Sequence, residues 1–109
     1  LFLNYIMNNL IRQVNINNQY IKYQIPLVPL YLIKWFPDAK TKIHSHEDKE
    51  CYFMTLWGGI REFRYFDCGK SVIVKDIEPF SKNHINDSIG KHKMINCLKE
   101  TNWSIHYYY

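Results

Sequence analysis

The sequence CYFMTLWGGIREFRYF (residues 51–66) decides the expected fold of this chain. Two apolar runs that are rich in aromatic residues, 51–57 and 60–66, lie on either side of Gly58–Gly59. Aromatic and β-branched side chains favour strands because they pack well against cross-strand neighbours. A pair of glycines supplies the positive φ angles that a tight hairpin turn requires. The stretch therefore predicts two antiparallel strands that are joined by a tight turn.

Similar runs occur on both sides of this stretch. Residues 20–25, 30–36, 71–76 and 103–109 are short and rich in β-branched or aromatic residues. Turn-forming residues separate the runs, namely Pro26, Pro29, Pro37–Asp38 and Cys68–Gly69–Lys70. Many short strands at hairpin spacing are typical of a β-barrel or a β-sandwich. We therefore expect an all-β domain.

The segment before the first of these runs has a different pattern. Between residues 5 and about 15, the apolar residues are Tyr5, Ile6, Met7, Leu10, Ile11 and Val14. This spacing is close to the period of an amphipathic helix. We expect a short N-terminal helix that covers one side of the sheet.

The length of 109 residues leaves room for one domain. Hydrophobic residues make up 47% of the chain and aromatic residues 17%, which is enough for a packed core. The chain neither begins with methionine nor ends on a turn signal. We therefore expect residues 1–109 to form a single domain, and we leave open that they are a fragment of a longer protein.

The charged residues and the cysteines limit the classes of partner. The net charge of +4 is spread along the chain, whereas nucleic-acid binding would need a basic stripe with interleaved aromatic residues. The apolar start, residues 1–3, is far too short to span a membrane and lacks the features of a signal peptide. The three cysteines form no CxxC pattern, which favours a reducing compartment. We expect a cytoplasmic monomer whose partners are small molecules, with no nucleic acid and no membrane.

The sequence IHSH (residues 43–46) carries the strongest signal for chemistry. Alternate side chains of a strand share one face, so His44 and His46 would form a ready pair of metal ligands. An isolated pair of this kind is also compatible with a polar loop. The following residues fit the first cupin motif, in which a glutamate and later a glycine follow the histidines. Glu50 and Cys51 stand at the glutamate position, and as neighbours in a strand only one of them can face the metal.

Two later segments add further polar groups. The run INDSIG (residues 85–90) is followed, after one residue, by His92. Near the end of the chain, Ser104, His106 and Tyr108 alternate, so they would line one face of the last strand. Each residue taken singly fits ordinary packing, but the combination favours a polar site.

In combination, these residues resemble the cysteine dioxygenase family of the cupin superfamily. The histidine pair and Cys51 match two metal histidines and a cysteine that lies seven residues after the first. The INDSIG run matches the segment that delivers the third metal histidine, His92, and residues 104–108 match the S-x-H-x-Y strand of the family. Trp35 also stands where the family has tryptophan. The resemblance extends from about residue 20 to residue 108.

The resemblance implies a single cupin β-barrel that binds one Fe(II) ion per chain. The metal ligands would be His44, His46 and His92, which bind iron on one face and leave the opposite positions open. The expected enzyme is a cysteine dioxygenase, whose substrates are L-cysteine and dioxygen. Both oxygen atoms would be added to the thiol, and the product would be cysteine sulfinic acid.

The resemblance also implies a thioether cross-link between Cys51 and the ring of Tyr108. This link would place the tyrosine hydroxyl beside the iron, where it could steer dioxygen and the substrate. His106 would hold that hydroxyl and Ser104 would fix the imidazole, in a relay of alternating donors and acceptors. These four residues are the expected catalytic groups around the metal.

One segment departs from the family pattern. Tyr20-Ile21-Lys22 stands where the family has Tyr-x-Arg, whose arginine holds the substrate carboxylate. We expect Tyr20, Lys22 and Tyr108 to bind the substrate, although lysine offers a mobile point charge in place of a rigid fork. Two alternatives therefore stay open. One is a dioxygenase for another small thiol, such as a mercapto acid or an aminothiol. The other is a non-dioxygenase metal-binding cupin in which Glu50 is a ligand.

Overall fold

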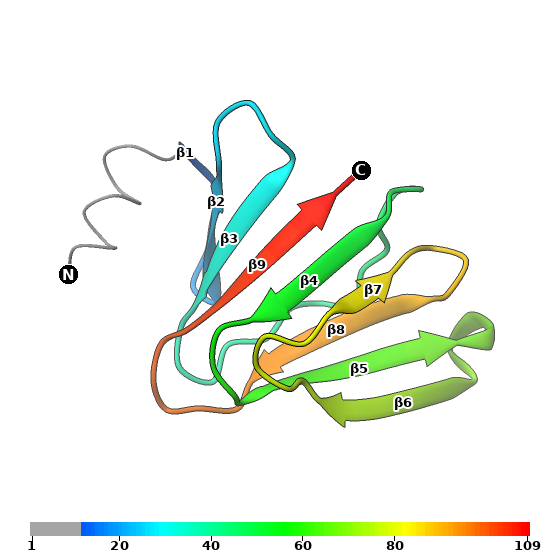
Figure 1. Cartoon of the computed structure of the whole chain (residues 1–109). Helices are drawn as coiled ribbons and strands as arrows, with labels where there is room; N and C mark the ends of the chain where they lie inside the picture. Colours follow the sequence, from blue (N-terminus) through cyan, green and yellow to red (C-terminus); the bar gives the residue numbers. More distant parts are fainter. Residues whose placement is uncertain (1–11) are drawn as a thin grey trace.

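The computed structural model describes residues 12–109, which form the predicted all-β domain (Figure 1). One short 3-10 turn is also present in this part of the chain. The strands of this part of the chain are β1 (Arg12–Ile16), β2 (Tyr20–Gln24), β3 (Leu30–Trp35), β4 (Cys51–Thr55), β5 (Ile60–Phe66), β6 (Ser71–Asp76), β7 (Asn83–Ile85), β8 (Lys91–Asn96) and β9 (Asn102–Tyr108). The 3-10 turn, Asp67–Gly69, connects β5 to β6.

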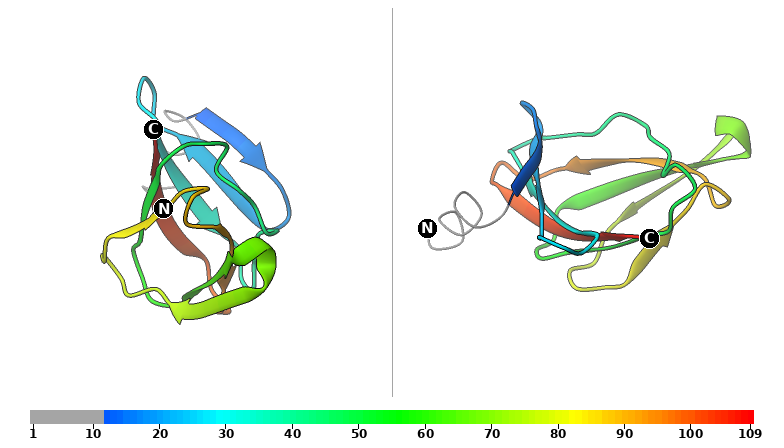
Figure 2. Two further views of the ribbon diagram at one scale, coloured as in Figure 1. Left: turned by 90° about the vertical axis from the view of Figure 1, so that its right-hand side faces the viewer. Right: turned by 90° about the horizontal axis from the view of Figure 1, so that it is seen from above.

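The strands form two antiparallel sheets that lie face to face (Figure 2). The larger sheet has six strands in the order β1-β2-β3-β9-β4-β7, and the smaller has three in the order β6-β5-β8. The segment between β3 and β4 contains no regular strand, but its backbone bridges to β8 at Lys40 and at His44. Both sheets therefore contribute to the walls of one interior space.

The predicted N-terminal helix is wrong for residues 12–15, which belong to strand β1. This strand pairs with β2 through partners such as Gln13 with Tyr23 and Ile16 with Ile21. The edge of the six-stranded sheet supplies backbone hydrogen-bond partners, and a short weak periodicity does not outweigh such pairing. The part of the prediction that covers residues 5–11 lies outside the described residues.

The predicted tight hairpin at Gly58–Gly59 is also wrong. Strand β4 pairs with β9 and β7, whereas β5 pairs with β6 and β8, so the two strands belong to different sheets. Gly59 has a φ of 104°, and its flexible backbone turns the chain from one sheet to the other. The hairpins between β2 and β3 and between β5 and β6 do form as predicted.

The interior between the sheets is apolar in one part and polar in another. Large buried apolar side chains include Trp35, Phe53, Ile60, Ile85 and Met94. The buried polar side chains include Glu62, His92, Asn96, Asn102, Ser104 and His106. Buried polar groups need partners inside the protein, so these residues mark the region where a site is built. Over residues 12–109, no helix has the length and apolar character needed to cross a bilayer.

Candidate metal centre

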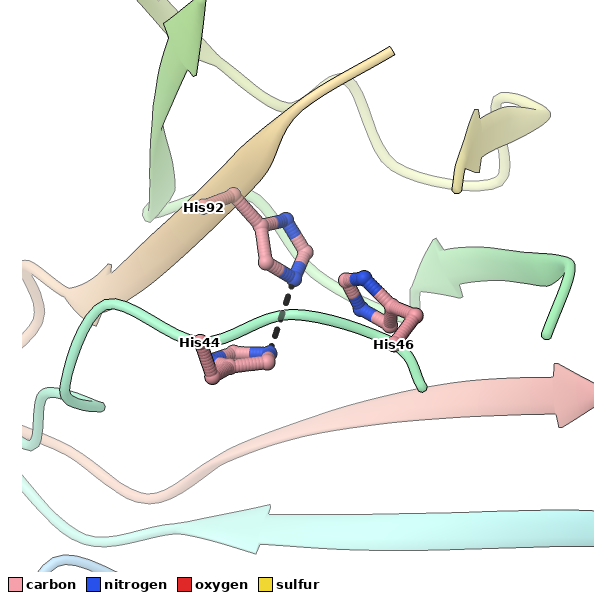
Figure 3. A group of neighbouring side chains, drawn as sticks. All are labelled: His44, His46 and His92. Atoms are coloured by element: carbon pink, nitrogen blue, oxygen red, sulfur yellow. Dashed lines mark hydrogen bonds between the residues drawn. The ribbon is translucent and has the colours of Figure 1, made fainter. Parts of the chain in front are cut away.

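Three imidazoles from two distant segments converge at the wall of the interior (Figure 3). The ring centroids of His44, His46 and His92 lie 4.5–5.1 Å apart, and their ligand atoms all lie within 4.8 Å of one another. His92 belongs to β8, while the other two histidines belong to the segment that precedes β4. The prediction that this pair lies in a strand is wrong, because only His44 forms a backbone bridge, with His92.

The INDSIG run positions two of these histidines through its own local structure. The carboxylate of Asp87 accepts hydrogen bonds from the backbone N–H groups of His46, at 2.8 Å, and Asp48, at 2.9 Å. This clamp holds the segment 46–48, in which Asp48 has a positive φ of 64°. At the end of the run Gly90 has a φ of 153°, and a side chain there would collide with the carbonyl oxygen of Tyr65. The glycine therefore lets β8, with His92, pack closely on β5.

The hydrogen bonds of two histidines fix which ring nitrogen faces the centre. Nδ1 of His44 lies 3.0 Å from the carbonyl oxygen of Lys42, and Nδ1 of His92 lies 2.7 Å from the carboxylate of Glu62. Both partners act as acceptors, so each Nδ1 carries the hydrogen. In a neutral imidazole the other nitrogen then offers a lone pair. The Nε2 atoms of His44 and His92 therefore both present lone pairs to the centre.

These lone pairs fit a bound metal ion. The two Nε2 atoms lie only 3.0 Å apart, and two neutral acceptors at this distance have no proton to share. Two nitrogens that bind one ion at about 2.1 Å and at right angles would be about 3.0 Å apart. Both ring nitrogens of His46 are buried without a protein partner among the described residues. The donor set thus suits a divalent transition metal, for which imidazole is a common ligand.

The surroundings also keep the two loop histidines neutral. Burial lowers the pKa of His44, and the neighbouring His92 lowers it further. Burial, followed by His92 and His44, lowers the pKa of His46 to about 4. A neutral imidazole is the form that binds a metal. Both side chains are therefore ready to act as ligands near pH 7.

The three histidines open onto a cavity of about 630 Å³. Its other lining residues include Tyr20, Lys22, Tyr31, Trp35, His106 and Tyr108. The ring of Tyr20 packs against Trp35, with centroids 5.5 Å apart. The structure thus brings the predicted metal ligands, the predicted substrate-binding residues, His106 and Tyr108 to one cavity.

Lys22 lies beside two of the aromatic rings that line this cavity. Its Nζ lies 4.6 Å from the ring centroid of Tyr31 and 4.6 Å from that of Tyr108. Burial lowers the pKa of Lys22, which shows that its ammonium group is partly removed from water. None of the ion pairs within residues 12–109 involves Lys22. A small anion that enters the cavity would therefore find a partly desolvated cation that forms no ion pair within the described residues.

Cys51 and Tyr108 are direct cross-strand partners on β4 and β9. The Cys51 side chain is buried, and a hydrogen bond joins it to the side chain of Tyr108. Burial raises the pKa of Cys51 to about 12 and also raises the pKa of Tyr108. Both groups therefore stay protonated near pH 7.

The preceding residue, Glu50, occupies the opposite face of the strand. Its carboxylate lies 2.8 Å from Nε2 of His84 and accepts hydrogen bonds of 3.1 Å from Asn86. The strand alternation that allowed only one of Glu50 and Cys51 to face the interior thus selects Cys51. Glu50 is not placed as a fourth ligand in this arrangement.

A hydrogen-bonded chain runs behind the cavity wall from Trp35 to His106. The indole N–H of Trp35 donates to the hydroxyl oxygen of Ser104 at 2.8 Å, and this hydroxyl lies 2.8 Å from Nε2 of His106. Because the serine oxygen already accepts from Trp35, its hydrogen is available to His106 Nε2. The remaining nitrogen, His106 Nδ1, is buried and has no partner in the described part of the chain. The His106 ring lies nearly parallel to that of Tyr108, with centroids 6.2 Å apart. The hydrogen bond from His106 to the tyrosine hydroxyl stays a prediction.

The sequence analysis missed four residues that support the site. Asp87 clamps the histidine loop, Tyr31 lies beside Lys22, and Glu62 with Arg64 lies behind His92. Glu62 and Ile60 share one face of β5, but the opposite face carries Phe63 and Tyr65, so the sequence did not show which face is buried.

Comparison with known proteins agrees with these features. The family model for cysteine dioxygenase type I matches residues 14–109. No curated protein matches the sequence. Among the solved structures that share the fold, the following three have sequence identities too low to indicate a shared function.

The cupin domain of Drosophila melanogaster CENP-C superposes with a TM-score of 0.74 at 10% identity, over 93% of this chain and 77% of that one. The capsular polysaccharide assembling protein CapF of Staphylococcus aureus superposes with a TM-score of 0.70 at 14% identity, over 90% of this chain and 28% of that one. An oxalate oxidase superposes with a TM-score of 0.64 at 12% identity, over 72% of this chain and 40% of that one. Because the family match covers most of the chain and a three-imidazole centre lines the cavity, we conclude that this is a metal-dependent thiol dioxygenase of the cupin fold, which belongs to the cysteine dioxygenase type I family.

Proposed function

We propose that the chain uses Fe(II), held by His44, His46 and His92, to oxidise the thiol of L-cysteine to cysteine sulfinic acid. The reaction adds both atoms of one dioxygen molecule to the sulfur, which loses four electrons to the oxygen. The observation that carries the proposal is the presence of three converging imidazoles and the side chain of Lys22 in one cavity. The first group suits a metal that binds a thiolate, and the second suits the carboxylate of an amino acid.

The absence of a carboxylate among the three converging ligands favours a thiolate substrate. Neutral imidazoles leave the full positive charge of the ion in place, and this charge attracts an anionic sulfur. When bound, ferrous iron supplies the means to activate dioxygen and to hold the substrate sulfur. The protein contributes the partly enclosed cavity and fixed orientations for the groups around it. All of these groups come from one chain, so the predicted monomer would suffice.

The relay behind the cavity would orient the tyrosine that faces the substrate. Ser104 fixes one nitrogen of His106, which leaves the Nδ1–H group as a donor toward the cavity side. Burial lowers the pKa of His106 well below its usual value, so the ring stays neutral and keeps this pattern. We expect the ring of Tyr108 to be held between this histidine and Lys22 while its hydroxyl steers the substrate.

The cross-strand pair of Cys51 and Tyr108 is proposed to form a thioether during aerobic turnover. A bond between the cysteine sulfur and the tyrosine ring would replace one S–H and one C–H bond, and dioxygen would take up the two protons and two electrons to give hydrogen peroxide. The intact mass of the protein should therefore decrease by two hydrogens after incubation with iron, cysteine and air. Cys51→Ser should keep its mass while retaining part of the activity, because the link positions the phenol but supplies no ligand. Peptide maps of turned-over protein that contain only free Cys51 would contradict this expectation.

Oxygen uptake by the iron-loaded protein tests the proposed reaction directly. We expect uptake with L-cysteine, with one sulfinate formed for each dioxygen consumed, and slower uptake with cysteamine, which lacks a carboxylate. Faster uptake with 3-mercaptopropionate than with cysteine would assign the chain to a mercapto acid instead. A protein that binds iron but consumes no oxygen with any of these thiols would refute the proposed function.

A further inference from the structure

A buried ion pair lies behind His92, beyond the cavity that holds the metal ligands. Glu62 and Arg64 of β5 line a second, smaller cavity of about 170 Å³, together with Phe66, Ile73 and Lys75. Oε2 of Glu62 receives two hydrogen bonds, one from Nδ1 of His92 at 2.7 Å and one from Nη2 of Arg64 at 3.0 Å. Arg64 and His92 are also direct cross-strand partners of β5 and β8. A guanidinium, a carboxylate and a metal ligand therefore form a continuous chain.

This ion pair is costly for a small domain. The Glu62 side chain is 0% exposed and that of Arg64 is 15% exposed, so both charges are largely removed from water. Oε1 of Glu62 and Nε of Arg64 are buried and lack partners among the described residues. Replacing a buried ion pair with apolar residues is often neutral or stabilising. Stability alone therefore does not account for two charged residues at inward positions of this strand.

The ion pair has a clear effect on His92. The carboxylate accepts the Nδ1 hydrogen, which fixes the ring orientation and directs the lone pair of Nε2 toward the centre. The Nη2 group of Arg64 donates to the same Oε2 atom at 3.0 Å, so the guanidinium holds the carboxylate in the position where it accepts from His92. Without the guanidinium, a fully buried carboxylate would lose its cationic partner.

We propose that Arg64 is a positioning residue that acts through Glu62 to raise the affinity of the three-histidine centre for its metal. The inference rests on the metal site of the proposed function but not on the oxidation of a thiol. Arginine suits this role because its guanidinium remains charged in the interior. The neighbouring Arg61 has no such role, since it points to the other face of β5 and pairs with Asp76 at the surface.

A double-mutant cycle of metal affinity tests the proposal. The dissociation constant for Co²⁺ is measured without oxygen or thiol, by competition with a chelator and by the visible spectrum of the bound ion. Glu62→Gln should weaken binding by roughly 10- to 100-fold, the usual loss when a ligand histidine loses its partner. Arg64→Met should weaken binding several-fold in the parent protein and should have no further effect in the Glu62→Gln background. Arg64→Lys should restore part of the affinity, because it keeps the charge.

The matched control is Arg61→Met, which removes an arginine from the same strand and should leave the affinity unchanged. Thermal unfolding of the metal-free variants shows whether each is folded, and if Arg64→Met is not, the same cycle is run with Arg64→Gln, which also removes the charge but keeps a polar side chain. The role of Arg64 would be overturned if its substitution left the Co²⁺ affinity of the parent protein unchanged. It would also be overturned if the substitution lowered this affinity equally in the parent and in the Glu62→Gln protein. Either result would leave the proposed function standing. Failure of the parent protein to bind any metal would overturn both.

Discussion

The variant His92→Ala is expected to lose metal binding and, with it, all oxygen uptake above background. His92 lies on β8 in the three-stranded sheet, so its removal leaves only two imidazoles, both on the loop that precedes β4. Two imidazoles without a third donor hold a divalent ion poorly. The loss of metal affinity should exceed the roughly 10- to 100-fold loss that follows when a ligand histidine loses only its hydrogen-bond partner. Elemental analysis of the metal after iron loading and an oxygen electrode measure the two effects.

The chain offers a matched control for this variant in a histidine outside the centre. His84 stacks on Tyr52, with ring centroids 4.5 Å apart, and pairs with Glu50 on the opposite face of the sheet. His84→Ala should therefore retain metal and turnover. Parental metal content in His92→Ala, or an equal loss in both variants, would show that the three imidazoles do not form the metal site.

The variant Lys22→Ala is expected to lower kcat/KM for cysteine by roughly 10- to 100-fold. A charge-assisted hydrogen bond to a carboxylate contributes about 1.5–3 kcal/mol, and each 1.4 kcal/mol corresponds to about tenfold. The lysine is partly desolvated between two aromatic rings, so water replaces it poorly as a partner for the substrate. Lys22→Arg should keep or improve the activity if the cavity accepts the larger group.

The decisive quantity is the ratio of cysteine to cysteamine turnover. Cysteamine has no carboxylate, so Lys22→Ala should change its turnover little and the ratio should fall. Lys34→Ala serves as the control, because the ammonium group of Lys34 lies 5.8 Å from the ring centroid of Trp103, away from the residues that line the cavity. If the ratio of cysteine to cysteamine turnover is the same in Lys22→Ala as in the parent protein, Lys22 does not bind the substrate carboxylate.

The strands with strong apolar patterns could be predicted from the sequence, whereas those without such patterns could not. Strand β8, KHKMIN, has two lysines, a histidine and an asparagine among its residues, and two of its three buried side chains, His92 and Asn96, are polar. Strand β7 has only three residues, too few for a periodic signal. The connection at Gly58–Gly59 was misread because a glycine pair has the same sequence whether it closes a hairpin or passes between sheets.

The pair His44 and His46 was predicted from its spacing, and His92 was assigned as the third ligand through the resemblance to the cysteine dioxygenase family. The residues that support these histidines were not predicted. The three histidines stand out as donors, and the structure brings them together even though the first two lie outside a strand. Glu62 and Arg64 resemble ordinary surface charges of an alternating strand, since Arg61 beside them is one. Only the packing of the two sheets shows which side of β5 faces the interior.

The residues that line the cavity come from two different sheets, and this arrangement affects how the sequences of such proteins can change in evolution. Lys22 and Tyr108 stand on the six-stranded sheet, whereas His92 and its partner Glu62 stand on the three-stranded sheet. With Lys22 in its proposed role, a substitution on β2 would change which thiol is accepted and would leave the strand that carries His92 unaltered. The proposed function therefore implies that substrate preference and metal chemistry can be inherited separately. A descendant protein with another side chain at position 22 would keep the three metal ligands.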